Sequence, residues 1–169
     1  MRKIAIALMA SAILGPACAA TGSPLGPSTD NTVTAEPAGG SIISSSTAAD
    51  LALCADETNR YRASVGLRPL VRAADLEEFA AHAASRDGVV HVAHAHFAET
   101  NGAGVSRAET EILWWRGFNV RSVIQRGLAQ MWQVGPGGEH YDIMAGAFGE
   151  IGCGIAVNGS EVTVTQDFR

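Results

Sequence analysis

Apolar residues beyond position 47 recur at helical spacing in two consecutive segments. Between Thr47 and Gly66 they return every three or four positions, which predicts a helix that begins near Thr47. Gly66 suits a left-handed cap at its end. The same spacing predicts a second helix over residues 75–87, which Gly88 should end. Residues 67–70, between the two helices, are predicted to be an extended connector.

The last third of the chain predicts one more helix and then strands. Residues 120–132 present an apolar face at helical spacing, and Asn119 before them is a good N-cap. Residues 151–157 and 161–168 alternate between apolar and polar positions, as strands do. Asn158-Gly159 between them is typical of a tight hairpin turn. The end of the chain is therefore predicted to be an antiparallel hairpin.

The N-terminal segment predicts export. A basic start is followed by an apolar run and then by a small-x-small site, which together indicate a signal over residues 1–19. Cys18 leaves an alternative, a lipoprotein that is cut before a lipid-bearing cysteine. Residues 20–47 are rich in Ser, Thr, Gly and Pro, so they bury too little apolar surface to fold and predict a flexible linker. The globular domain is then residues 48–169.

Composition and charge exclude several functions. The formal net charge of −5 becomes about −7 once a signal containing Arg2 and Lys3 is removed. No lysine then remains, which excludes Schiff-base and lysine-base chemistry. The acidic balance argues against nucleic acid and against attraction to anionic lipid headgroups. A membrane contact is expected only through a lipid anchor at Cys18, and the protein is expected to be secreted or associated with the cell envelope.

Two cysteines fall within the predicted domain, Cys54 and Cys153. In an oxidising compartment an isolated pair predicts a disulfide between them. The bridge would join the first helix to a late strand. The alternative is two separate buried thiols that act as small hydrophobic side chains.

Three histidines stand close together, at positions 91, 94 and 96. Imidazoles are common metal ligands, although this spacing matches no closed zinc pattern. In a helix His91 and His94 would share one face, whereas in an extended segment His94 and His96 would. The alternative is that one or two of them are exposed at a helix end.

An ordered series of motifs resembles the CAP (SCP-like) superfamily, which includes cysteine-rich secretory and pathogenesis-related proteins. The series is Asn59-x-x-Arg62 with Pro69-Leu70, His96-Phe97, Ala108-Glu109-Thr110, Trp132, Glu139-His140-Tyr141 and the stretch from Phe148 to Gly154. The resemblance covers about residues 50–168 and implies an α+β fold, a three-layer α-β-α sandwich with a short antiparallel sheet. Asn59 and Arg62 are interpreted as structural, with Arg62 paired to a carboxylate or to terminal helix carbonyls.

The resemblance also implies a ligand cleft. The family's two cavity histidines match His96 and His140, and its cavity glutamate matches Glu109. His94 is the alternative to His96, and Glu111 is the alternative to Glu109. Glu139 is a further candidate, because the glutamate of the family's Trp-x-x-Glu signature is replaced here by glycine at position 135. A four-residue arrangement of the protease type is therefore not expected.

Three functions remain open at this stage. The first is an extracellular binding module for a small ligand or an envelope component, with His96 and His140 holding a divalent metal such as Zn²⁺ and Glu109 supporting them. The second is a hydrolase that activates a zinc-bound water, with Glu109 as general base. The third is lipid or sterol binding in an apolar groove, as in some members of the superfamily. No hydrolase signature such as Gly-x-Ser-x-Gly or His-Glu-x-x-His is present in the sequence.

Overall fold

The computed structural model describes residues 46–169. The predicted export signal, and all but the end of the predicted linker, lie outside this range. Within residues 46–169 no helix combines the length and the hydropathy needed to cross a bilayer.

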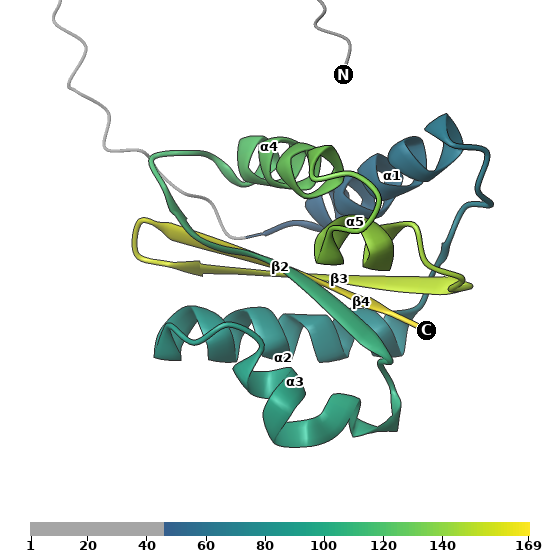
Figure 1. Ribbon diagram of the computed structural model, residues 1–169. Helices are drawn as coiled ribbons and strands as arrows, with labels where there is room; N and C mark the ends of the chain where they lie inside the picture. The colour runs from purple at the N-terminus through teal and green to yellow at the C-terminus, as the bar shows by residue number, and fades with distance from the viewer. Residues whose placement is uncertain (1–45) are drawn as a thin grey trace, which may run out of the picture. The chain divides into compact units, whose positions relative to one another are not determined.

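The described chain forms a three-layer α-β-α sandwich around one mixed sheet (Figure 1). Its elements are α1 (Ala48–Ser64), β1 (Val71–Arg72), α2 (Ala74–Val90), α3 (Ala95–Thr100), a 3-10 turn (Asn101–Gly104), β2 (Ala108–Arg116), α4 (Val120–Gln133), α5 (Glu139–Met144), β3 (Glu150–Asn158) and β4 (Glu161–Phe168). The strand order is β1-β3-β4-β2, so β2 lies at one edge. Helices α1, α4 and α5 cover one face, and α2 and α3 cover the other (Figure 1). The predicted fold class is confirmed.

The sheet differs from the prediction at its other edge. β2, β3 and β4 pair antiparallel as expected, whereas β1 pairs parallel to β3 through Val71 and Arg72. A two-residue strand is too short to produce an alternating pattern, so no element was predicted at residues 71–72, which follow the predicted connector. The hairpin of β3 and β4 turns at Asn158-Gly159, and Gly159 has a φ of 61°. This turn was predicted from its sequence.

Helix ends follow the predicted caps with one exception. The Thr47 side chain accepts a hydrogen bond from the Asp50 amide in a capping box, and the Asn119 side chain accepts one from the Ser122 amide. The predicted end at Gly88 is wrong, because α2 continues to Val90. A Cβ at Gly88 would lie 3.2 Å from the hydroxyl oxygen of Thr163 in β4. This glycine therefore lets the helix pack closely on the sheet and does not end it.

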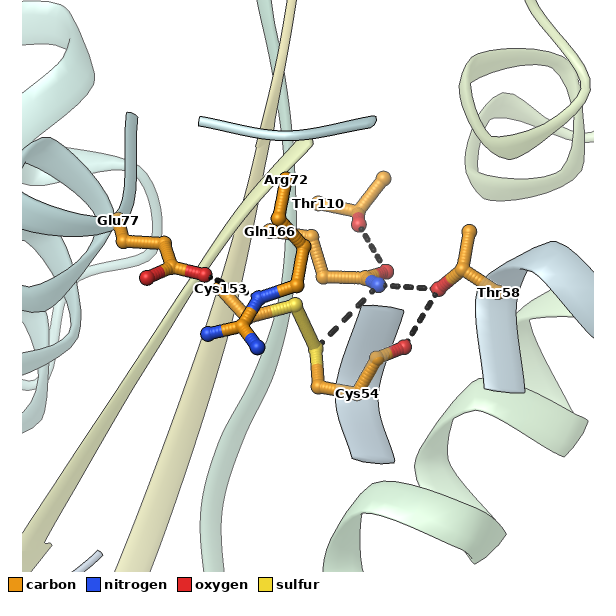
Figure 2. Close-up of a disulfide and its surroundings, with 7 residues drawn as sticks. All are labelled: Cys54, Thr58, Arg72, Glu77, Thr110, Cys153 and Gln166. Atoms are coloured by element: carbon orange, nitrogen blue, oxygen red, sulfur yellow. Dashed lines mark hydrogen bonds and ion pairs between the residues drawn. A yellow bond between two sulfur atoms is a disulfide. The ribbon is translucent and has the colours of Figure 1, made fainter. Parts of the chain in front are cut away.

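The predicted disulfide between Cys54 and Cys153 is confirmed (Figure 2). It links α1 to β3 inside the core that α1, α4 and α5 form with the sheet. Beside it the Gln166 side chain donates to the hydroxyl of Thr58 (2.6 Å) and accepts from the hydroxyl of Thr110 (3.1 Å). These buried polar groups therefore satisfy one another's hydrogen bonds beside the disulfide.

The opening motif of the resemblance is structural, as interpreted. The buried Arg62 donates to the carbonyls of Met144 (2.7 Å) and Gly146 (3.0 Å). Asn59 exchanges two hydrogen bonds with the backbone of Leu70. Both residues tie α1 to loops on the α1 side of the sheet.

On the opposite face, α2 packs directly on the backbone of β3. A Cβ at Gly152 would lie 2.1 Å from the carbonyl carbon of Leu76, and one at Gly154 would lie 2.0 Å from that of Ala80. Such distances are far below van der Waals contact, so only glycine permits this approach. The close packing brings the C-terminal end of α2 against β4 and β2, where acidic side chains gather.

Candidate metal centre

Three side chains meet on the α2 face of the sheet, next to the edge strand. His94 Nδ1 lies 2.8 Å from an oxygen of Glu109 and 3.5 Å from an oxygen of Glu111. One potential ligand atom from each residue lies within 4.8 Å of the other two. The two carboxylates are buried, whereas the His94 side chain is 43% exposed and opens the centre to solvent.

The strand geometry explains why both glutamates point to the same place. Glu109 and Glu111 are two residues apart on β2, so their side chains leave the same face of the sheet. In the register with β4, Glu109 lies opposite Asp167 and Glu111 opposite Thr165. The hydroxyl of Thr165 donates to Glu111 Oε1 (3.0 Å), which fixes that carboxylate.

His94 is held by the backbone of the turn between α2 and α3. His91 and His94 both adopt left-handed conformations, with φ of 53° and 55°, which reverses the chain at a cost in strain. The amide of His94 donates to Glu111 Oε2 (2.7 Å), and the amide of His96 donates to Asp87 Oδ1 (2.9 Å). The carboxylates thus position the loop that carries the imidazole.

Four buried carboxyl groups surround this single imidazole. Asp87 and Asp167 are fully buried, and Glu109 and Glu111 are each 6% exposed. Asp87 Oδ2, Glu109 Oε2 and both Asp167 oxygens have no hydrogen-bond partner within the described residues. Buried acceptors without partners are rare and costly. The centre therefore has unused capacity for a cation.

The pKa shifts reflect this crowding. The hydrogen bond that His94 Nδ1 donates to the Glu109 carboxylate raises the pKa of His94 above its ordinary value. Burial raises the pKa of Glu111 to about 8. Burial also raises the pKa of Asp167 to about 8, with the charges of Glu109 and Glu111 adding to the effect. A neutral pH thus leaves protons within the cluster, and a bound cation would compete with them.

The structure brings together the alternatives named from the sequence. His94 and Glu111 lie with Glu109, whereas His96 does not belong to this group. The ring of His96 packs 4.7 Å from that of Phe79 and 6.3 Å from that of His82.

His140 is the second residue of α5, in the layer on the other face of the sheet. Gly135 and Gly137 have positive φ in the loop before it. His140 lines a cavity of about 270 Å³ together with Glu111. It is not one of the three converging ligands, and the neighbouring Glu139 is exposed.

Aromatic packing holds α5, which carries His140, in place. The Trp132 ring lies 5.4 Å from the ring of Tyr61 and 4.4 Å from that of Tyr141. The tryptophan of the altered Trp-x-x-Glu signature therefore positions α5 through Tyr141. Gly135 stands where the family has a glutamate. A Cβ atom at this position would have no other atom within 4 Å.

Sequence reasoning missed Asp87 and Asp167. Asp87 was taken only as the end of the second helix. No local signal marked Asp167, because the face of the strand that carries it is polar at positions 161, 163, 165 and 167, which is typical of an exposed face. The alternation of β4 places it on the same face as Thr163 and Thr165, opposite the face of Gln166.

The comparisons agree with this architecture. Residues 55–168 match the model of the family described as CAP, cysteine-rich secretory protein family. An outer surface protein from Borrelia burgdorferi is 15% identical with a TM-score of 0.53, over 74% of this chain and 96% of that one. Na-ASP-1 is 16% identical with a TM-score of 0.53, over 85% of this chain and 43% of that one.

A third solved structure, a cysteine-rich secretory protein from Staphylococcus aureus, is 16% identical with a TM-score of 0.48. The match covers 72% of this chain and 38% of that protein, so the chain spans well under half of this structure and of Na-ASP-1. No curated protein matches the sequence. The identities are low, and these likenesses bear on the fold alone.

Proposed function

Because this chain belongs to the CAP, or cysteine-rich secretory protein, family, we propose that it is an exported binding module whose centre of His94, Glu109 and Glu111 holds a divalent cation. Members of this family are typically secreted or surface-associated. The observation that carries the proposal is the set of buried carboxylate oxygens without partners around one imidazole.

The charge balance supports a cation at this position. Four buried carboxyl groups face one imidazole, and protonated His94 is the only basic side chain among the five. A divalent ion would displace the proton that Glu111 holds at neutral pH and would give Glu109 Oε2 a partner. One imidazole with two carboxylates suits Zn²⁺ with an open position, and it also suits Mn²⁺. When bound, the ion would supply a Lewis acid for a ligand oxygen.

Glu111 supports the proposal in a second way. The family's second cavity carboxylate is absent, since glycine stands at position 135. Glu111 on β2 supplies a second carboxylate to the centre, and its Oε2 lies 3.5 Å from His94 Nδ1.

Both glutamates are engaged, which favours binding over hydrolysis. Glu109 contacts His94, while Glu111 accepts from the His94 amide and from Thr165. Because both glutamates contact His94, we assign them as ligands of the cation and not as a general base, so the hydrolase alternative ranks second.

Export is supported by the apolar N-terminal segment with its small-x-small site and by the disulfide, which is typical of an oxidising compartment. Lipidation at Cys18 stays a prediction. The mass of the exported chain tests it, because a chain with a diacylglycerol on an N-terminal cysteine differs greatly in mass from a chain without lipid.

Calorimetric titration of the chelator-treated full chain with Zn²⁺, and separately with Mn²⁺, tests the cation site. We expect one site, with an affinity that falls at least about tenfold in Glu109→Gln and in His94→Asn, since each removes a ligand atom. The matched control is His82→Asn, because His82 is an exposed histidine of α2 outside the group. Equal affinity in all four proteins, or no binding of either ion, would refute the proposal.

A further inference from the structure

A groove runs beside the edge strand β2, on the α4 side of the sheet. It consists of two cavities, of about 270 and 560 Å³, which share Trp115 and Gln130 as lining residues. The larger cavity is lined by Trp115, Phe118, Arg126, Ala129, Gln130 and Gln133. The smaller one continues to Glu111 and His140.

The larger cavity combines flat apolar surfaces with hydrogen-bonding groups. The rings of Trp115 and Phe118 lie 5.6 Å apart at an angle of 52° and are both partly exposed. The side-chain amides of Gln130 and Gln133 each offer donors and an acceptor. Gln130 and Gln133 are both exposed on α4, so their amides can reach a ligand in the groove.

Arg126 adds the only charge to this lining. Its guanidinium lies 4.9 Å from the centre of the Phe118 ring, which steadies it by a cation–π contact. The Arg126 side chain is exposed on α4, so its N–H donors can reach a ligand. A guanidinium held in place with exposed N–H donors is suited to bind a carboxylate.

We propose that this groove binds an oligosaccharide that carries carboxylate groups. Sugar rings present a C–H face to aromatic side chains and hydroxyl groups that act both as donors and as acceptors. Aromatic surfaces with a few placed polar groups are what a shallow ligand site requires. The two glutamines fit the hydroxyl groups, and Arg126 fits the carboxylate.

The edge strand itself argues against an extended peptide as the occupant. Pairing of β2 with β4 is interrupted between Ile112 and Trp115, and Trp114 has a φ of 56°. A bulge of this kind interrupts the row of backbone groups that an added strand needs. Recognition in this groove would therefore depend on side chains.

This inference is independent of the cation site, although the two regions adjoin. The smaller cavity shares Glu111 with the proposed metal centre, so a chain of sugars along the groove would end near that centre. Titrations of the groove in the presence of EDTA test it separately from the cation site. EDTA removes a bound metal ion and leaves the groove unchanged.

The test uses two probes of equal length. Hyaluronan tetrasaccharide alternates glucuronate with N-acetylglucosamine, whereas chitotetraose contains N-acetylglucosamine alone and no carboxylate. Each is titrated into the full chain in EDTA by calorimetry, with the indole N–H signal of Trp115 followed by NMR. We expect the hyaluronan tetrasaccharide to bind more tightly and to shift the Trp115 signal.

Two variants and a control locate the site. Trp115→Ala should weaken binding of both probes at least about tenfold, because it removes the stacking surface. Arg126→Gln should weaken binding of the hyaluronan tetrasaccharide about tenfold and leave chitotetraose unchanged. Arg121→Gln makes the same charge change on α4 outside the lining residues, and it should alter neither.

Three results would overturn the inference. The first is no binding of either probe at millimolar concentration, and the second is equal losses in the two arginine variants. The third is binding of an extended peptide, but of neither sugar, that Trp115→Ala abolishes.

Discussion

Replacing Asp167 with asparagine should stabilise the protein at neutral pH. Asp167 is fully buried on β4, opposite Glu109, and neither of its oxygens has a hydrogen-bond partner within the described residues. The pKa of its carboxyl group rises from an ordinary 3.8 to about 8, chiefly because of burial. Asparagine keeps the size and shape of the side chain and removes its titration.

The magnitude follows from the pKa shift. Between pH 3.8 and about 8 the folded protein holds a proton on Asp167 that the unfolded chain has released. Stability contributed by this group is therefore present at low pH and is lost as the pH rises through that window. At 1.36 kcal/mol per pH unit, the cost at pH 7 has a ceiling of about 4 kcal/mol. Relaxation and entry of water reduce it, so we expect Asp167→Asn to gain about 2 kcal/mol at pH 7.

Urea unfolding of the wild type and the variant, in EDTA at pH 4, 7 and 8.5, measures this gain. It should be near zero at pH 4 and largest at pH 8.5. Asp56→Asn is the control, because Asp56 is exposed on α1, and its effect should stay within about 0.5 kcal/mol at every pH. A gain that does not change with pH, or a loss of stability at pH 7, would show that the carboxylate is paired in solution.

Four further predictions concern the core, a cap and the centre. Replacing both Cys54 and Cys153 with serine should lower the free energy of unfolding by about 4 kcal/mol, since the bridge closes a loop of nearly the whole domain. The midpoint of denaturant unfolding measures this loss, and an unchanged midpoint would contradict the prediction. Gly154→Ala should cost about 3 kcal/mol or more, because its Cβ would lie 2.0 Å from the backbone of α2. Asn119→Ala should cost about 1 kcal/mol through loss of the α4 cap, with no change in cation affinity. Zn²⁺ binding at pH 7 should release at least one proton. The release is measured as a dependence of the binding heat on the ionisation enthalpy of the buffer. A binding heat that is the same in every buffer would contradict the raised pKa of His94.

Local signals in the sequence were sufficient to predict most of the fold. Thr47 and Asn119 cap their helices through contacts within three residues, and Asn158-Gly159 turns the hairpin by its own conformational preference. Gly88 misled the prediction because its role depends on β4, which lies 75 residues away in the sequence near Thr163. A glycine within a helix can mark either an end or a close contact, and only tertiary packing distinguishes the two.

The site was predicted less fully for a related reason. The sequence pointed to Glu109 and retained Glu111 because strand alternation makes both possible. The choice between His94 and His96 depends on two left-handed residues in the turn before α3, and histidine has no strong preference that would reveal them. Asp87 and Asp167 come from two different elements and acquire their importance only when α2 packs against the sheet.

The close packing of α2 on the sheet and the properties of the acidic centre are connected. Gly152 and Gly154 let α2 pack directly on the backbone of β3, and Gly152 lies opposite the buried Asp167 in the register of β3 with β4. Burial raises the pKa of Glu111 and of Asp167, and carboxylate oxygens of this centre have no hydrogen-bond partner within the described residues. A fold selected only for stability would place apolar side chains or fully paired polar groups there, as the core around the disulfide does on the opposite face. The cost of keeping acids at this position is consistent with a role in binding, and the largest stability gain from a single substitution should therefore lie at the centre proposed to bind a cation.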